Sequence, residues 1–169
     1  MGCRNPDVVP RVLVPGGGQE SNRRAGTQNT PGIAAFGAAA RAARAGLGRV
    51  GATRAMRDAL EERLRSNSSN VKVMGRGAPR LANTSMVAVA GISAETAVIA
   101  FDLEGVALSA GSACSSGKVG ASHVVEAMGV EPEFRRSAVR ISIGVETTAD
   151  EVERFATIWA RVISRLTGP

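Results

Sequence analysis

The pattern of apolar and polar residues changes its period along this chain. The first 30 residues combine short valine runs with prolines and a glycine triplet, which predicts loop and short strand. Residues 31–65 are rich in alanine and arginine, and Met56, Leu60 and Leu64 keep the spacing of one helical face. We therefore expect a long helical region over 31–65, with a bend or break where glycines cluster.

Two residues mark the expected start of this helical region. Proline is favoured in the first turn of a helix, the position expected for Pro31, because its missing N–H would have no partner there. Threonine can accept a hydrogen bond from a first-turn amide, so Thr30 is the expected cap.

The rest of the chain alternates between strand and helix patterns. Short apolar or β-branched runs predict strands, at residues 71–74, 85–90, 106–109 and 138–143. Helical spacing predicts helices, at residues 94–104, 122–128 and from about 148 onward. This alternation predicts the α/β (α+β) class, with a small sheet covered by helices.

The last helix has the best-defined sequence pattern. Thr148 and Glu151 have the spacing of a capping box, in which each side chain bonds the backbone amide of the other residue. One apolar stripe follows, formed by Val152, Phe155, Trp159, Val162 and Leu166. Such a stripe is typical of a helix packed on a core.

Composition restricts the chemistry. The chain has 169 residues, 44% of them apolar, but only one histidine and two lysines. No metal site of several histidines can form within one chain, and we expect none. Covalent lysine chemistry would need Lys72 or Lys118. The single histidine, His123, lies beside apolar residues on an expected helix and is more typical of a structural position.

Charge is uneven along the chain. The net charge is +6, and the excess of Lys and Arg falls in the first 80 residues. The arginine-rich region 41–65 could meet nucleic acid, but no aromatic residue lies between these arginines to stack on bases. A solvated helix face is therefore favoured, with no nucleic-acid partner.

No segment predicts a membrane span. The longest uncharged stretch, residues 25–40, is too short and too polar to cross a bilayer. We expect a cytoplasmic protein without a membrane partner.

A loop of small residues carries the first candidate for chemistry. Residues 109–117 read Ser-Ala-Gly-Ser-Ala-Cys-Ser-Ser-Gly, so Cys114 has no bulky neighbour, and Lys118 could favour its thiolate. Such a thiolate can attack sulfur and carry it as a persulfide. A small buried cysteine in a turn explains the same sequence equally well.

Two further segments could bind anionic groups. Arg140 lies in a strand pattern between Val139 and Ile141, so it should point away from them, and its guanidinium could grip a carboxylate. A surface arginine on a half-solvated strand is the alternative. The glycine-rich segment 16–29 could bind a phosphate through its amides and the Thr27 hydroxyl, although a glycine triplet alone is a weak signal.

Taken in order, these segments resemble the C-terminal part of a NifS/IscS-like cysteine desulfurase, a class V aminotransferase-like enzyme that uses pyridoxal phosphate. The resembling stretches are Gly16–Asn29, Asn83–Ser85, Ser93–Ser116, Ala121–Val130 and Val139–Gly144. The resemblance runs over nearly the whole chain, and the cysteine loop followed by Arg-Ile-Ser-Ile-Gly is a specific pair.

The resemblance implies roles for three residues. Cys114 matches the cysteine that takes sulfur from L-cysteine as a persulfide, leaving L-alanine. Arg140 matches the arginine that holds the substrate carboxylate. Thr27 matches a threonine that contacts the cofactor phosphate of the partner subunit in a homodimer. A sulfur-acceptor protein, in iron–sulfur cluster or thio-cofactor assembly, would take the sulfur.

The resemblance also implies an organisation and a gap. Residues 1–30 resemble the end of the cofactor domain, and residues 31–169 the C-terminal small domain with its long linking helix. Glu20-Ser21-Asn22 replaces the usual Glu-Arg-Gly of the family. The cofactor-binding lysine of the family matches neither Lys72 nor Lys118. We therefore expect a truncated chain that is inactive alone and needs a complementing N-terminal segment. The alternative is a non-enzymatic remnant or a binding module that pairs with an intact desulfurase.

Overall fold

The computed structural model describes residues 11, 12, 14–110 and 122–168. The chain divides into two compact units, residues 1–47 and 48–169. The boundary expected near residue 30 from the sequence stays a prediction. Among the described residues, no helix is both long and apolar enough to cross a membrane.

The first unit holds a short turn and one helix. The turn α1 (Gln19–Asn22) has left-handed backbone angles at Glu20, Ser21 and Asn22, with φ of 53°, 57° and 63°. The helix α2 spans Thr30–Gly46. Its cap is Asn29, whose Oδ1 accepts from the Gly32 amide at 3.1 Å. The expectation of a Thr30 cap is therefore wrong, because Thr30 is already the first helical residue.

A 3₁₀ turn (Leu47–Arg49) ends α2 and provides the break expected among the glycines. The second unit contains four helices and four strands in its described part. The helices are α3 (Val50–Ser66), α4 (Ala94–Asp102), α5 (His123–Ala127) and α6 (Ala149–Thr167). The strands are β1 (Val71–Val73), β2 (Thr84–Val89), β3 (Ser109–Ala110) and β4 (Val139–Ser142), and Pro132–Phe134 form a further 3₁₀ turn.

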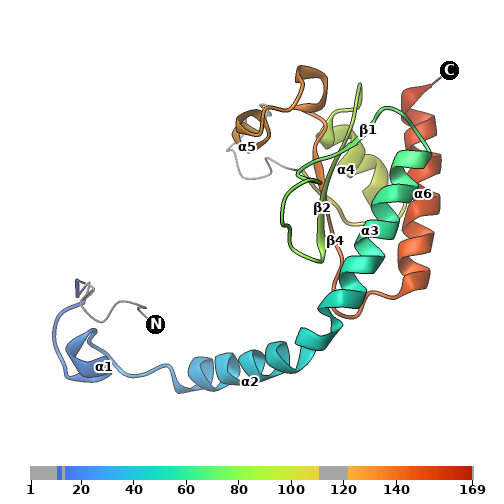
Figure 1. Ribbon diagram of the computed structural model, residues 1–169. Helices are drawn as coiled ribbons and strands as arrows, with labels where there is room; N and C mark the ends of the chain where they lie inside the picture. Colours follow the sequence, from blue (N-terminus) through green and yellow to red (C-terminus); the bar gives the residue numbers. More distant parts are fainter. Residues whose placement is uncertain (1–10, 13, 111–121, 169) are drawn as a thin grey trace. The chain divides into compact units, whose positions relative to one another are not determined.

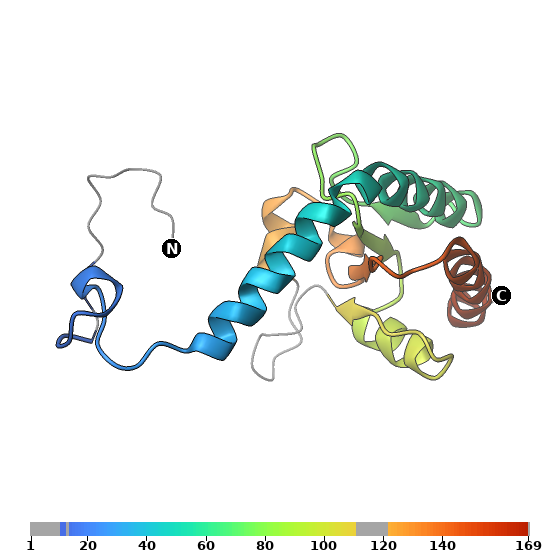
Figure 2. The same cartoon turned by 90° about the horizontal axis from the view of Figure 1, so that it is seen from below.

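The four strands form one antiparallel sheet in the order β1-β2-β4-β3. Helices α3, α4 and α6 lie on one face of this sheet, and α5 lies on the other (Figures 1 and 2). The predicted fold class, a small sheet covered by helices, is confirmed. The strand expected at residues 106–109 begins only at its last residue, because Ser109 and Ala110 are the two residues that pair with β4.

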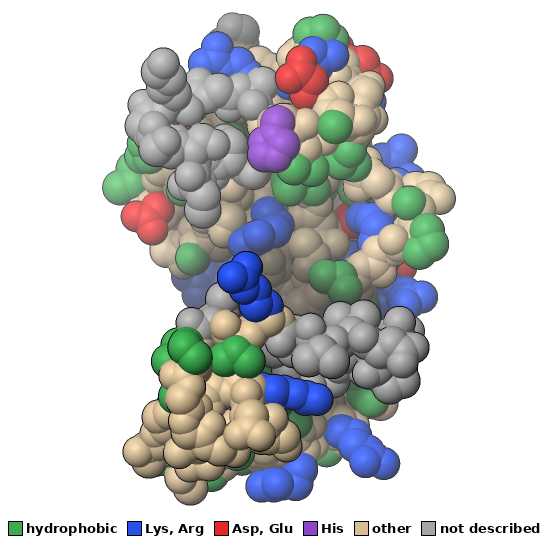
Figure 3. Space-filling view, turned by 90° about the vertical axis from the view of Figure 1, so that its left-hand side faces the viewer, with side chains coloured by type: hydrophobic (Ala, Val, Ile, Leu, Met, Phe, Trp, Pro, Cys, Tyr) green, Lys and Arg blue, Asp and Glu red, His purple; other side chains and the backbone are tan. Residues whose placement is uncertain are grey.

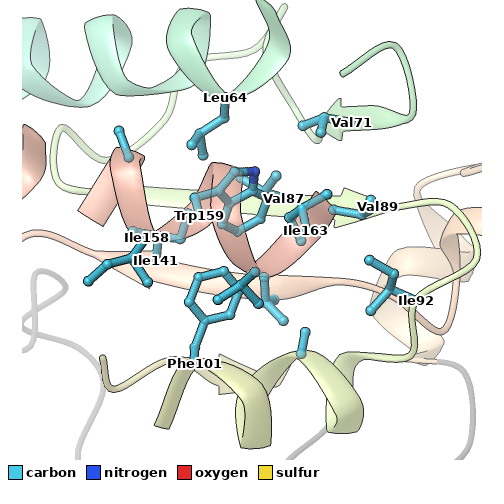
Figure 4. Close-up of a cluster of buried hydrophobic side chains, with 14 of the residues drawn as sticks. Leu64, Val71, Val87, Val89, Ile92, Phe101, Ile141, Ile158, Trp159 and Ile163 are labelled. Atoms are coloured by element: carbon cyan, nitrogen blue, oxygen red, sulfur yellow. The ribbon is translucent and has the colours of Figure 1, made fainter. Parts of the chain in front are cut away.

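The main core lies between the sheet and its three covering helices. Trp159 of α6 is 1% exposed and packs against Phe101 of α4, with ring centroids 5.3 Å apart. Figure 4 shows Trp159 between Leu64 of α3 and Phe101. The apolar stripe predicted on the last helix faces this core, and its capping box is present: the Thr148 hydroxyl accepts from the Glu151 amide at 3.2 Å.

One carboxylate of α3 is buried. Glu61 is 1% exposed and accepts two hydrogen bonds from Arg80, at 2.7 and 2.9 Å, and a third from the Ser85 hydroxyl of β2. The Arg57 Nε lies 3.9 Å from the same carboxylate. Burial acts to raise the pKa of Glu61, but these hydrogen bonds and the two arginine charges outweigh it and hold the pKa below its ordinary value. The buried Glu61 carboxylate therefore links α3 to Arg80 by an ion pair and to Ser85 of β2 by a hydrogen bond.

Candidate functional site

The sheet face that carries α5 also carries Arg140. In β4, Val139 and Ile141 are buried against the helices, whereas Arg140 and Ser142 are exposed. Strand residues alternate between faces, so the guanidinium projects from the face opposite the main core. This orientation was predicted from the apolar neighbours of Arg140.

Cross-strand pairing sets the surroundings of Arg140. It pairs with Met86 of β2 on one side and with Ser109 of β3 on the other. Its Nη2 donates to the Ser109 Oγ at 3.4 Å, at the long end of the range for hydrogen bonds. No acidic side chain among the described residues forms an ion pair with Arg140. Most of its donors are therefore free to bind a carboxylate.

An apolar cluster borders this arginine. Val125 of α5 packs with Met74, Ala88 and Ala138 on the outer face of the sheet, and Met86 joins the cluster from its edge. Figure 3 views the molecule from the left-hand side of Figure 1, where Lys and Arg side chains (blue) and hydrophobic ones (green) are exposed. A ligand at Arg140 would thus meet both positive charge and apolar surface.

Lys72, the one described lysine, also lies in this unit. It forms an ion pair with Glu131, and its Nζ lies 5.6 Å from the centre of the Phe134 ring. The hydrogen bond from Lys72 lowers the pKa of Glu131. The carboxylate and the aromatic ring account for the position of the Lys72 ammonium without a cofactor.

His123 is exposed at the first position of α5, and Ser122 before it is buried. An exposed side chain such as that of His123 does not pack in the core. The sequence favoured a structural position for His123, and this position is at the surface and not in the core.

Thr27 belongs to the first unit, in a loop that an arginine holds. The Arg24 Nη1 donates to the carbonyl oxygens of Gly26 at 3.0 Å and Thr27 at 3.2 Å, and more weakly to that of Ala25. Gly26 has a φ of 90°, a backbone conformation that other residues rarely adopt. The Thr27 side chain is exposed and its hydroxyl has no hydrogen-bond partner among the described residues. It fits a donor to an anionic group such as a phosphate.

Cys114, the first candidate for chemistry, lies outside the described residues, as do Cys3 and Lys118. Cys114 follows Ala110 by four residues, and Ala110 pairs with Val139, the neighbour of Arg140. The sequence thus leads from the strand beside Arg140 directly into the cysteine segment.

Two residues lie in segments that the sequence singled out, but their roles were not predicted. Ser109 is the hydroxyl partner of Arg140, and Arg24 positions the loop of Thr27. Ser109 could have been found as the residue at which the small-residue loop leaves a strand. Arg24 could have been found from its place three residues before Thr27, but only the backbone path reveals that it binds three carbonyl groups.

Comparison with known proteins places these features in a family. Residues 16–155 match the family described as Aminotransferase class-V. A cysteine desulfurase of Gluconacetobacter diazotrophicus is 40% identical over 157 residues, and cysteine desulfurase 2 of Trichormus variabilis is 37% identical over 156 residues. Each match covers 92% of this chain and 39% of the relative. The chain therefore spans about two fifths of the length of these relatives.

Solved structures agree with the sequence matches. A NifS-like protein from Rickettsia africae superposes with a TM-score of 0.75 at 28% identity, over 90% of this chain and 40% of that protein. A second structure, titled NifS-like protein, superposes with a TM-score of 0.79 at 28% identity, over 95% of this chain and 40% of its own. The resemblance drawn from the cysteine loop and the Arg140 strand is confirmed.

Proposed function

This chain belongs to the class V aminotransferase family, and we propose that it supplies the persulfide-forming part of a cysteine desulfurase. The Cys114 thiolate attacks the sulfur of bound L-cysteine, and a sulfur–sulfur bond forms as the carbon–sulfur bond breaks. The electron pair of that bond passes to carbon, which takes up a proton to give L-alanine. Cys114 keeps the sulfur as a persulfide for an acceptor protein, in iron–sulfur cluster or thio-cofactor assembly.

The placement of Arg140 carries this proposal. Its guanidinium is exposed, has no acidic partner among the described residues, and lies beside the strand that leads into the cysteine segment. Cys114 follows Ala110 by four residues in the sequence, and a chain of that length spans at most about 14 Å. A carboxylate held by Arg140 would thus bring the sulfur of the same small amino acid within reach of the thiol.

Pyridoxal phosphate, when bound, supplies the electron withdrawal that makes the carbon–sulfur bond labile. Within this chain, the Thr27 hydroxyl fits a contact to its phosphate, as a donor in a loop held by Arg24. Lys72 pairs with Glu131 at the surface, and we propose no covalent role for it. We propose that the active species is a cytoplasmic homodimer or a complex with a complementing segment that carries the cofactor lysine.

The test combines this chain with a segment of a longer relative that contains the cofactor lysine. With pyridoxal phosphate and L-cysteine, the complex should form alanine, and mass spectrometry should find one added sulfur atom on Cys114. The Cys114→Ser variant should lose both products, whereas Cys3→Ser should keep both. Sulfur on Cys114 that forms equally well with the chain alone would contradict the need for a complementing lysine.

A second candidate is a binding module that accepts sulfur on Cys114 from an intact desulfurase. The engagement of Lys72 by Glu131 favours it, since the described part of the chain then offers no free amine for covalent chemistry. This candidate predicts a persulfide on Cys114 only when an intact desulfurase is present, and alanine formation that does not depend on Arg140.

A further inference from the structure

A serine hydroxyl lies beside the guanidinium of Arg140. Ser109 and Arg140 are directly opposite each other in the antiparallel pair of β3 and β4, so both side chains stand on the same face of the sheet. The Arg140 Nη2 and the Ser109 Oγ are 3.4 Å apart. The register of the two strands therefore sets the position of Ser109 next to Arg140.

The Ser109 hydroxyl still has a hydrogen bond to donate. A serine hydroxyl can both donate and accept, whereas an arginine side chain can only donate. The Ser109 Oγ is therefore the acceptor in its contact with Arg140. It donates to no other atom within the described part of the chain, so its hydrogen is available to a ligand.

The distance between the two atoms suits a shared acceptor. A separation of 3.4 Å is long for a direct hydrogen bond between nitrogen and oxygen. An oxygen placed about 2.8 Å from each atom would form a triangle with this 3.4 Å side, and about 2.8 Å is an ordinary distance for hydrogen bonds to a carboxylate. Neither side chain would need to move. The pair thus has the geometry of two donors to one carboxylate oxygen.

The guanidinium keeps enough donors for the second carboxylate oxygen. The N–H groups of an arginine form a fork that matches the two oxygens of a carboxylate. In Arg140, one of these groups points to Ser109, and none forms an ion pair with a described acidic side chain. A hydroxyl that accepts from a cation also becomes a better donor, because hydrogen bonds in a chain polarise one another. Arg140 can therefore bind both oxygens while Ser109 donates to one of them.

The nearest serine on the same strand lies elsewhere. Ser142 shares the outer face of β4 with Arg140, but it pairs with Thr84 of β2, and residues two positions apart on a strand are separated by about 7 Å. The Arg140 Nη2 is within reach of Ser109 instead, on the strand whose sequence continues into the cysteine segment. This asymmetry favours Ser109 over Ser142 as the second donor.

We propose that Ser109 is a second binding residue for the substrate carboxylate: its Oγ accepts from Arg140, and its hydrogen is donated to the carboxylate oxygen that Arg140 binds. This inference rests on the proposed function and extends it by one residue. Ser109 then helps to select an amino acid over the corresponding amine, because the amine has no acceptor for the second donor.

NMR spectroscopy of the full chain measures carboxylate binding without any turnover. The probes are L-alanine, which carries the carboxylate, and ethylamine, which is the same molecule without it. L-Alanine should shift the Nε–Hε signal of Arg140, which is identified by its loss in Arg140→Gln, and ethylamine should not. Ser109→Ala should raise the dissociation constant of L-alanine about 10-fold or more, the loss expected for one hydrogen bond to a charged group.

Two further variants separate a binding role from a structural one. Ser109→Thr keeps the hydroxyl and suits a strand, so it should bind L-alanine as the wild-type chain does. Ser142→Ala is the matched control, because it removes a hydroxyl from the same face of the same strand, and it should leave the dissociation constant unchanged. Urea unfolding should be alike in the wild-type chain and Ser109→Ala, since the contact that is lost is the long one to Arg140.

The complemented enzyme gives a second readout. Ser109→Ala should raise the KM for L-cysteine about 10-fold or more and leave kcat nearly unchanged, because the carboxylate is bound equally in the substrate and in the transition state. A wild-type complex that forms no alanine would refute the proposed function, whereas the L-alanine titration of the chain would still decide the role of Ser109.

Three results would overturn the inference: an Arg140 signal that L-alanine does not shift, a dissociation constant of L-alanine that Ser109→Ala leaves unchanged, or an equal loss of binding in Ser142→Ala.

Discussion

Removing the charge of Glu61 should destabilise the second unit strongly. The Glu61→Gln variant keeps the shape of the side chain but leaves the Arg80 guanidinium, which donates to it at 2.7 and 2.9 Å, without a counter-charge. Arg57, whose Nε lies 3.9 Å away, also loses a neighbouring charge but keeps Asp58. Breaking a buried ion pair by removing one partner costs about 3–5 kcal/mol, and we expect a loss of that size.

Urea unfolding followed by tryptophan fluorescence measures this loss, because Trp159 is the only tryptophan and is buried in the same unit. The matched control is Glu62→Gln. Glu62 is the next residue of α3 and pairs with Arg65 and Arg76 at the surface, so its loss should cost less than about 1 kcal/mol. Replacing Glu61 and Arg80 together by leucine should recover most of the stability, since the buried charges then leave as a pair. A Glu61→Gln loss no larger than that of the control would refute the assignment of Glu61 to a buried ion pair.

The pH dependence gives an independent check on the same group. Because the folded-state pKa of Glu61 lies below its ordinary value, its charge stabilises the fold fully above about pH 5, where the unfolded-state carboxyl is also ionised. This contribution is lost as the pH falls through the depressed folded-state pKa. The difference in unfolding free energy between wild type and Glu61→Gln should therefore be constant at neutral pH and shrink in acid. A difference that grows in acid would contradict the direction of the shift.

Three further predictions concern the site and the core. Arg140→Gln should change the free energy of unfolding by no more than about 0.5 kcal/mol, because the side chain makes one long contact, but should raise the KM for L-cysteine of the complemented enzyme about 10-fold or more; an unchanged KM would exclude it from carboxylate binding. Thr148→Ala should cost about 0.5–2 kcal/mol in urea unfolding through loss of the cap on α6, and a cost near zero would mean that the capping box does not form in solution. Phe101→Ala should cost about 3–5 kcal/mol by the same assay, since Phe101 is fully buried against Trp159, and a cost below about 1 kcal/mol would contradict that packing.

Features that depend on residues close together in the sequence could be predicted from the sequence pattern. The capping box at Thr148 and the stripe through Trp159 depend on residues three to four positions apart, and both are present. The orientation of Arg140 follows from the alternation of a strand, and it too could be predicted. The cap of α2 was missed by one residue, because Asn29 and Thr30 are both good caps and only the backbone angles decide between them.

Contacts between distant segments could not be predicted in this way. Glu61 and Arg80 lie 19 residues apart, and Glu61 and Ser85 lie 24 apart, so no helical or strand period connects them. An isolated glutamate on a helix is most simply expected at the surface. Its burial depends on how the segment before β2 folds back over α3. The role of Ser109 could not be predicted either, because Ser109 becomes the partner of Arg140 only through the register of β3 against β4.

Stability does not explain why an arginine stands at position 140. Its neighbours Val139 and Ile141 are buried, and an apolar or threonine side chain would suit the outer face beside Met86 at least as well. Eight other arginines of the second unit form an ion pair, whereas Arg49 and Arg54, like Arg140, form none among the described residues; the eight are Arg57, Arg63, Arg65, Arg76, Arg80, Arg135, Arg161 and Arg165. Arg140 has none among the described residues and makes one weak contact to a hydroxyl. Arg140 is therefore available to the carboxylate ligand that we propose for it, beside the strand whose sequence continues into the cysteine segment.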